Sequence, residues 1–297
     1  MSKKTEQQIQ QEPPVKKTAL GSLFAKKEKQ TPIYDAILFI SDEGSSGKST
    51  AAIALTRIKR AMQHETGEAV DLYVCDNNHK EAMECLGQRD DTDELLPNEE
   101  QTPDYCAYFN IRTESDKMID RLKSPSKYKF FDLPSDSIDE LLEIFGDASS
   151  FLKAFEGTRT RLTFAIPCNT ITKSLPAVIK LYKNFVGINP NVEIRFAFIY
   201  NHSIIKIKSK GENGSFLELF NKDPEIIRLK KSVPVIEQHI KAHIESRFIK
   251  VLDDSVKNGE NWLDFLEEGS LHGRLEYHDQ MIMEGFLEEY AILADQI

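Results

Sequence analysis

Short apolar runs alternate along the chain with longer amphipathic segments. Residues 34–41, YDAILFIS, are a continuous apolar run bounded by turn residues, which is typical of a parallel strand covered on both faces. Residues 49–63 place apolar side chains at helical spacing, and residues 69–76 again have the pattern of a strand. The predicted order at the start of the folded part is therefore strand, helix, strand.

This alternation continues through most of the chain. Further strands are predicted at 106–111, 161–167, 192–201 and 233–236, and a strand within 127–137 is predicted to end at Asp132. Helices are predicted at 114–124, 138–156, 174–186 and 215–221, and the chain looks helical from 238 onward. Alternating strands and helices predict an α/β fold with a doubly wound, mainly parallel sheet flanked by helices.

Composition divides the chain into three parts. Residues 1–32 hold few large apolar side chains and are predicted to be a flexible basic arm, with seven lysines against three glutamates in the first thirty residues. Residues 33–250 are predicted to form the α/β domain. Residues 251–297 are predicted to be an acidic helical extension, with twelve acids against Lys257 and Arg274. Within the domain, the acidic stretch at 79–126 is weakly patterned, which is typical of a functional or disordered loop.

Several classes of protein are disfavoured by the sequence. No run of about 18 apolar residues is present, so a membrane span is not expected. The first residues lack the apolar core of a secretory signal, which favours a cytoplasmic protein. The four cysteines form no C-x-x-C pair, so the sequence indicates neither a zinc site nor a disulfide framework.

The turn after the first strand, SDEGSSGKST, has the chemistry of a phosphate-binding loop. Small residues let backbone N–H groups close around phosphate oxygens, and the start of the following helix favours an anion. A lysine is needed to reach the outer phosphates and a hydroxyl to hold Mg²⁺. These roles fall to Gly44, Ser45, Ser46 and Gly47 for the backbone cradle, Lys48 for the outer phosphates, and Ser49, followed by Thr50, for the metal.

Two aspartates at the ends of predicted strands support this interpretation. Magnesium held by a loop hydroxyl is usually also approached by an acid at the end of a neighbouring strand. Asp132 in FFDLPS and Asp76 in CDNN occupy such positions. Asp132 is therefore predicted to share the metal with Ser49.

Together these motifs resemble the ParA/MinD superfamily of P-loop ATPases. The family's loop has the form K-G-G-x-G-K-[ST]. Aligned with it, Gly44 and Ser45 stand at the two glycines and Ser46 at the variable place, and residues 47–50, GKST, match. FFDLPS resembles the family's hydrophobic-D-x-P element, and FIYN resembles the strand whose last residue, here Asn201, contacts adenine. The resemblance spans about residues 33–245 and is nearest to relatives in plasmid stability, partition and mobilisation. It implies ATP and Mg²⁺ as ligands, with catalytic roles for Lys48, Asp76 and Asp132.

The chain departs from this family at two places. The family's signature lysine, which reaches the partner's phosphates in a nucleotide-dependent homodimer, is replaced by Glu43, an acid that would repel phosphate. The family's D-x-D-P switch keeps one aspartate here. If Asp76 matches the first, Asn78 stands at the second. If Asp76 matches the second, Cys75-Asp76-Asn77 is still usable, and the register stays open. Nucleotide binding is therefore better supported than hydrolysis or dimerisation.

The motifs and their departures from the family favour one function, leave a second open and disfavour a third. The first is an ATP-binding and ATP-hydrolysing switch for plasmid or DNA partition, stability or conjugal mobilisation. Its contacts to DNA or a DNA-bound protein would come from the N-terminal lysines or from residues 204–211. The alternative is a nucleotide-binding adaptor with little or no turnover that acts through protein contacts. A small-molecule kinase or synthetase is disfavoured, because the 79–126 stretch offers no convincing substrate-binding set.

Overall fold

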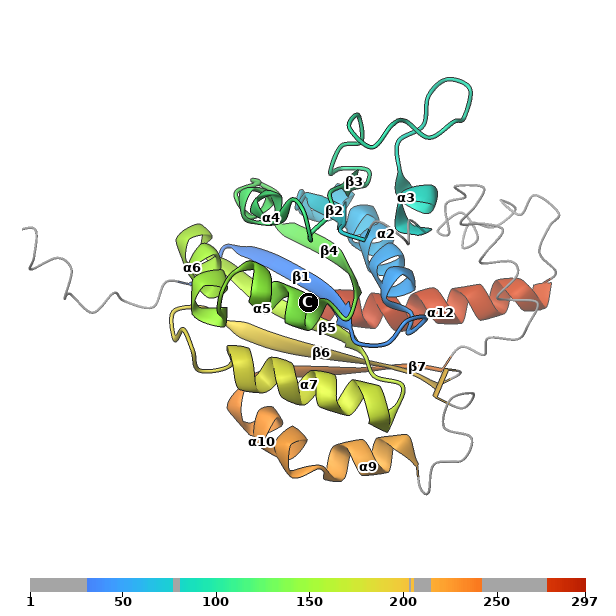
Figure 1. Ribbon diagram of the computed structural model, residues 1–297. Helices are drawn as coiled ribbons and strands as arrows, with labels where there is room; N and C mark the ends of the chain where they lie inside the picture. Colours follow the sequence, from blue (N-terminus) through green and yellow to red (C-terminus); the bar gives the residue numbers. More distant parts are fainter. Residues whose placement is uncertain (1–30, 77–80, 203, 206–214, 242–276) are drawn as a thin grey trace, which may run out of the picture. The chain divides into compact units, whose positions relative to one another are not determined.

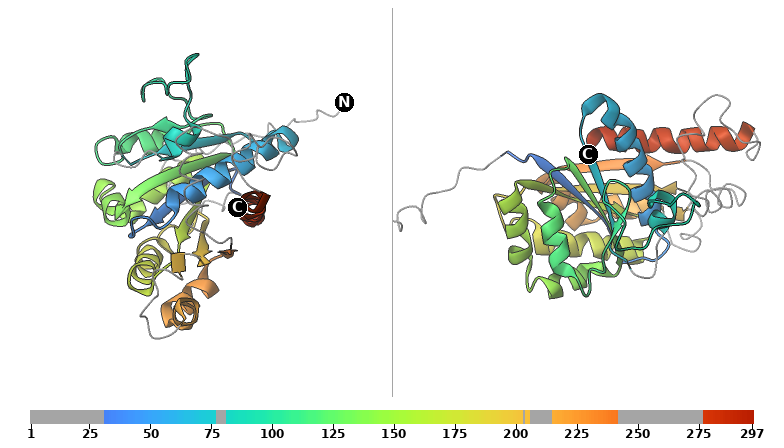
Figure 2. Two further views of the ribbon diagram at one scale, coloured as in Figure 1. Left: turned by 90° about the vertical axis from the view of Figure 1, so that its right-hand side faces the viewer. Right: turned by 90° about the horizontal axis from the view of Figure 1, so that it is seen from above.

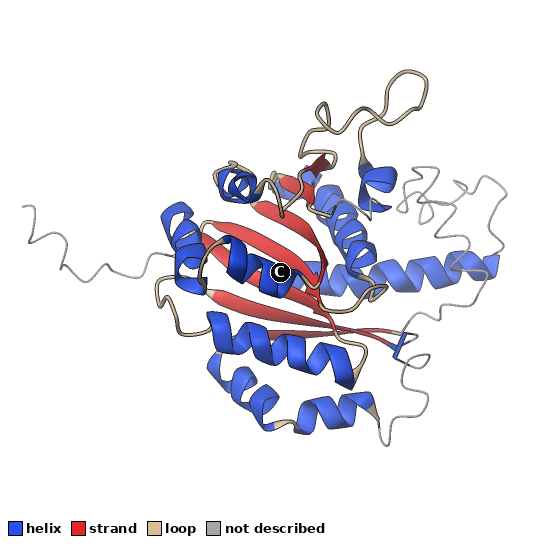
Figure 3. Cartoon of the chain, viewed as in Figure 1, coloured by secondary structure: helices blue, strands red, loops and turns tan. Residues whose placement is uncertain are grey.

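The computed structural model describes residues 31–76, 81–202, 204–205, 215–241 and 277–297, which belong to one compact unit. Seven parallel strands form a single sheet in the order β3-β2-β4-β1-β5-β6-β7, with helices on both faces (Figures 1 and 3). This confirms the predicted α/β fold. The strands are β1 Tyr34–Ser41, β2 Val70–Val74, β3 Ala107–Tyr108, β4 Tyr128–Ser135, β5 Thr160–Pro167, β6 Ile194–Asn201 and β7 Val235–Ile240.

Two apolar layers cover the sheet. Along β1, Ala36 and Leu38 point to one layer while Ile37 and Phe39 point to the other, as the two-residue period of a strand requires. The first layer is formed by α4 Ser115–Leu122, α5 Ser137–Ile144, α6 Ala148–Thr158, α7 Ile171–Phe185, α9 Phe216–Lys222 and α10 Pro224–Ser232. The second is formed by α2 Lys48–Thr66, α3 Glu81–Leu86 and α12 Tyr277–Gln296 (Figure 2).

Several predicted boundaries were wrong. The strand predicted to end at Asp132 continues to Ser135, because its pairing with β1 extends to Ser41. The single helix predicted at 138–156 is two helices, separated at Gly146, whose φ of 75° is left-handed. Residues 238–240 were predicted to be helical and belong to β7, while α10 was not predicted. The strand predicted at 106–111 is reduced to two residues, Ala107–Tyr108.

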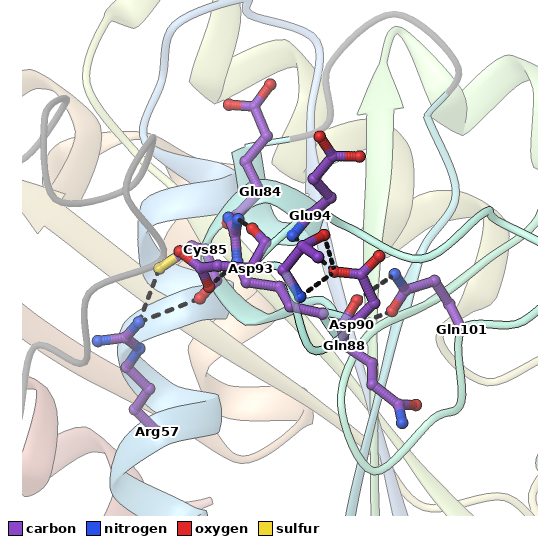
Figure 4. Close-up of polar contacts among 10 residues, drawn as sticks. Arg57, Glu84, Cys85, Gln88, Asp90, Asp93, Glu94 and Gln101 are labelled. Atoms are coloured by element: carbon purple, nitrogen blue, oxygen red, sulfur yellow. Dashed lines mark hydrogen bonds and ion pairs between the residues drawn. The ribbon is translucent and has the colours of Figure 1, made fainter.

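The acidic stretch after β2 is held by polar contacts where the structure describes it (Figure 4). Arg57 of α2 is buried and donates to the Sγ atom of Cys85 at 2.9 Å and to its carbonyl oxygen at 3.2 Å. The side chain of Gln101 accepts from the backbone N–H of Gln88 at 2.7 Å and donates to its carbonyl at 2.9 Å. Asp90 accepts from the N–H groups of Thr92 and Glu94. This part of the stretch is therefore held by its own hydrogen bonds, and Arg57 joins its first helix to α2.

The last helix, α12, packs on α2 and β7. Its buried residues belong to the same apolar layer as α2 and include Phe286, Leu287, Tyr290, Leu293 and Ala294. Near the carboxyl end of β7, the backbone N–H of Lys241 donates to Glu289 at 2.7 Å. Among the described residues, no helix is long and apolar enough to cross a membrane.

Candidate phosphate-binding site

The turn between β1 and α2 has the backbone of an anion cradle. Ser45 has φ 53° and Gly47 has φ 92°, both in the left-handed region that glycine adopts most readily. Gly47 caps α2 without a side-chain hydrogen bond, and the first turn of α2 contains no acid. The N–H groups that begin α2 are therefore left without a side-chain cap, and the helix dipole favours an anion at this point.

The other predicted loop residues surround this cradle. Gly44 and Ser45 are exposed, and Thr50 lies half-buried in the first turn of α2. Ser46 is buried, and its hydroxyl has no hydrogen-bond partner. A Cβ atom added at Gly44 would lie 3.9 Å from the hydroxyl of Ser135 at the end of β4. The loop is thus bordered on one side by the end of β4.

Lys48 is buried beneath the loop with only 8% of its surface exposed. Its Nζ atom donates to the hydroxyl of Ser135 at 3.1 Å. Burial lowers the pKa of the ammonium group, while the negative charges of Asp132, Asp76 and Glu81 act in the opposite direction. The lysine therefore places a positive charge among carboxylates at the carboxyl edge of the sheet.

Asp132 lies beside Lys48 and Ser49, and its sharing of a metal with Ser49 stays a prediction. Its side chain is buried, accepts a hydrogen bond from the Ser49 side chain and leaves Oδ1 without a hydrogen-bond partner. Burial raises the pKa of this carboxyl group to about 7, opposed by the Ser49 hydrogen bond and by Lys48. An unsatisfied buried carboxylate oxygen beside a hydroxyl is a donor set that suits Mg²⁺, which takes one or two protein oxygens and completes its shell with water and phosphate.

Other metal chemistry has no comparable support. In the parts of the chain that the structure describes, no group of three or more His, Cys, Asp or Glu side chains could hold a metal ion. The four cysteines are buried, and each is a free thiol.

Asp76 comes close to this group from the neighbouring strand. It is buried just beyond β2, where the backbone N–H of Cys75 donates to the carbonyl of Asp132 at 2.9 Å. Its charge acts on both Lys48 and Asp132. Asn78 lies outside the described residues, so the register of the switch segment stays open.

Asn201 ends β6, two strands away from β1, and is also buried. Its Oδ1 atom accepts from the N–H of Ile204 at 3.2 Å. The Cδ1 atom of Ile204 would lie 3.7 Å from a Cβ added at Gly47. The segment after β6 thus reaches the phosphate loop. The N-terminal lysines and residues 206–211, which were predicted to contact DNA, lie outside the described residues.

The sequence did not predict two polar residues that contact the loop. Ser135 receives the Lys48 hydrogen bond, and Asn169 donates from Nδ2 to the carbonyl of Ser46 at 2.8 Å. Ser135 is the last residue of β4, and Asn169 lies two residues beyond the end of β5. Their proximity to the loop follows from sheet order, with β4 and β5 on either side of β1.

Comparison with known proteins adds little to this description. No family model and no curated protein matches the chain. Among solved structures, the MinD cell division protein of Aquifex aeolicus is similar, with a TM-score of 0.44, 15% sequence identity, and coverage of 89% of this chain and 98% of that chain. A likeness this distant carries no argument about family or function. The site therefore rests on its own geometry.

Proposed function

We propose that this chain is a nucleotide-binding switch protein that binds MgATP at the loop between β1 and α2 and hydrolyses it. The observation that carries the proposal is the arrangement around Lys48. A buried ammonium group, an uncapped helix start and a buried carboxylate with a free oxygen meet at the carboxyl edge of a parallel sheet, where ligands of such sheets bind.

Each of these residues has a chemical role in this proposal. The backbone N–H groups of the loop would bind phosphate oxygens, and Lys48 would exchange its hydrogen bond to Ser135 for one to an outer phosphate. Ser49 and Asp132 would hold Mg²⁺, which neutralises charge on the phosphates when bound. Asp76, or a residue after it, would orient the attacking water. Asn201 would contact the base, and the family resemblance favours adenine.

The substitution Lys48→Ala tests this function. Loss of the ammonium group should weaken binding of MgATP by about 10-fold or more, because a charge-assisted hydrogen bond contributes roughly 1.5–3 kcal/mol. Binding is measured by isothermal titration, and turnover by phosphate release. The matched control is Lys153→Ala, which removes an exposed lysine from α6. It should leave both quantities unchanged.

The outcomes separate the two candidate functions. Turnover in the wild-type chain that is lost in Lys48→Ala supports an ATPase. Nucleotide binding without turnover in either protein favours an adaptor that signals through protein contacts. Glu43 favours this alternative, because it stands where the family has a lysine, and an acid there would repel the phosphates bound to a second subunit. A wild-type chain that binds no nucleotide at millimolar concentration would refute both.

The biological setting is a further part of the proposal. The resemblance of the loop and of FFDLPS to relatives in plasmid partition, stability and mobilisation is its support, together with the basic N-terminal residues as a contact to DNA or to a DNA-bound protein. A nucleotide-dependent homodimer belongs to the same proposal. Sedimentation with ATP, with ADP and without nucleotide would detect it.

A further inference from the structure

The loop after β5 contacts the phosphate loop through two successive residues. Asn169 is fully buried, and its Nδ2 atom donates to the carbonyl of Ser46 at 2.8 Å. The next residue, Thr170, donates from its hydroxyl to the Oε2 atom of Glu43 at 3.2 Å. The phosphate loop is thus bonded at both Glu43 and Ser46, on either side of Gly44 and Ser45.

The loop after β5 is itself anchored and does not depend on the phosphate loop. The hydroxyl of Ser174, in the first turn of α7, accepts from the backbone N–H of Asn169 at 2.9 Å and of Thr170 at 3.2 Å. The N–H of Cys168 donates to the carbonyl of Ile199 in β6 at 2.9 Å. The segment that carries both donors, Asn169 and Thr170, is therefore held in place by hydrogen bonds to α7 and to β6.

Glu43 is also fixed from its own strand. Its backbone N–H donates to the hydroxyl of Ser41, the last residue of β1, at 3.1 Å. Its side chain is directed to Thr170 within the same chain. The carboxylate of Glu43 therefore has a hydrogen-bond donor within its own chain, and this role does not require it to face a bound phosphate.

We propose that Asn169 and Thr170 are positioning residues that hold the phosphate loop in its binding conformation before nucleotide arrives, with Glu43 as the acceptor through which Thr170 acts. The inference rests on the proposed function. Ordering one backbone residue costs about 1–2 kcal/mol, so a loop that is already ordered binds its ligand more tightly. The left-handed conformations of Ser45 and Gly47 make such support necessary, because Ser45 adopts that conformation at a cost.

The test compares variants that remove these bonds with variants that keep them. Thr170→Val removes the hydroxyl at nearly constant shape, and Thr170→Ser restores it. Glu43→Ala removes the acceptor, and Glu43→Gln keeps an oxygen that can accept. Asn169→Ala removes the donor to Ser46. Dissociation constants for MgATP and MgADP are measured alongside the urea midpoint and the amide hydrogen exchange of residues 44–48 in the nucleotide-free proteins.

We expect Thr170→Val and Glu43→Ala to weaken nucleotide binding about 3- to 10-fold, the effect of one hydrogen bond. The double variant Thr170→Val/Glu43→Ala should bind nucleotide no more weakly than either single variant, because both changes remove the same hydrogen bond. Asn169→Ala should weaken binding about 10-fold, since it removes a fully buried donor and leaves the Ser46 carbonyl without that bond. Thr170→Ser and Glu43→Gln should bind within about 2-fold of wild type. Amide exchange in the loop should be faster in the three variants that remove a bond.

The readouts separate this inference from the proposed function. If the wild-type chain binds nucleotide and Thr170→Val and Asn169→Ala bind it equally well, the inference is overturned and the proposed function stands. If no nucleotide binds but loop exchange still rises in Thr170→Val, the proposed function fails and the supporting role stands. Unchanged exchange and unchanged affinity in Thr170→Val overturn the inference even if Asn169→Ala fails to fold.

Discussion

At the scale of single residues, burial shifts the pKa values of the two charged side chains at the centre of the candidate site. Lys48 and Asp132 are both buried. Desolvation lowers the pKa of Lys48 and raises that of Asp132, and both shifts favour the neutral form of the side chain. Each also lies near the opposite charge, which acts against that shift. The cost of desolvating each charge is therefore partly offset by the other, and a bound phosphate and divalent cation would bring further opposite charge to Lys48 and Asp132.

The lowered pKa of His202 predicts how the stability of the fold depends on pH. Its Nε2 atom lies 2.9 Å from Nδ1 of His239, and burial, then His239 and Lys241, lower the pKa of His202 below its usual value of 6.5. The unfolded chain therefore takes up a proton before the folded one does. The stability that neutral His202 contributes should be complete above pH 6.5 and decline as the pH falls below it.

The variant His202→Gln removes this titration but keeps an amide that can bond to His239. Its free energy of unfolding, measured in urea at several pH values from 7.5 to 5, should fall less steeply than that of wild type. Other groups titrate in the same range in both proteins, so the difference between the two curves isolates His202. Parallel curves over the whole range would contradict the pKa shift.

At the scale of elements, the sequence predicted the sheet better than the helices that cover it. Continuous apolar runs such as 34–41 and 161–167 are visible because both faces of a central strand are buried, and the first was confirmed to the residue. The boundary between α5 and α6 was missed because the apolar spacing continues through the break, although Gly146 and the N-cap residue Asp147 mark it. The strand predicted at 233–236 begins before β7, Val235–Ile240, and ends too early, because the pattern of β7 mixes apolar and polar residues at the sheet edge.

Residues of the candidate site were predictable only where they belong to a short motif that can be recognised by itself. Lys48 and Ser49 follow one strand directly, and Asp132 was found because its motif is itself recognisable. Asn169 and Ser135 could not be predicted, since their role depends on β4 and β5 lying next to β1. Parallel pairing of strands far apart in the chain brings these residues together, and a single sequence does not show strand order.

Pro176 in α7 offers a prediction at the same scale. It lies inside the helix, exposed, where it removes one backbone hydrogen bond and its ring crowds the preceding turn. Pro176→Ala should raise the free energy of unfolding in urea by about 1–3 kcal/mol. The control Thr172→Ala, in the first turn of the same helix, should gain only about 0.5 kcal/mol from helix propensity. Equal gains would show that α7 bends around the proline without loss.

At the scale of the whole described unit, one face of the sheet is covered by helices from opposite ends of the sequence. Helix α2 follows β1 directly, whereas α12 ends the chain, and the two contact each other. Tyr290 and Leu293 lie in the same apolar layer as Leu55 and Ile58 of α2. The guanidinium of Arg161 in β5 also donates to the carbonyl of Ile297 at 3.1 Å. The stability of the helix that begins at Lys48 should therefore depend on α12.

Two adjacent residues of α12 test this dependence, because Leu293 is fully buried and Ile292 is 52% exposed. Leu293→Ala should lower the free energy of unfolding by about 2–5 kcal/mol, since it leaves a cavity in the apolar layer. Ile292→Ala should change it by no more than about 0.5 kcal/mol. Both variants, measured in urea at a temperature where they remain folded, should keep the wild-type affinity for nucleotide, because neither side chain reaches the phosphate loop. Similar losses in the two variants would mean that α12 does not pack on α2 and β7 in solution, and that the layer beneath the phosphate loop is completed in another way.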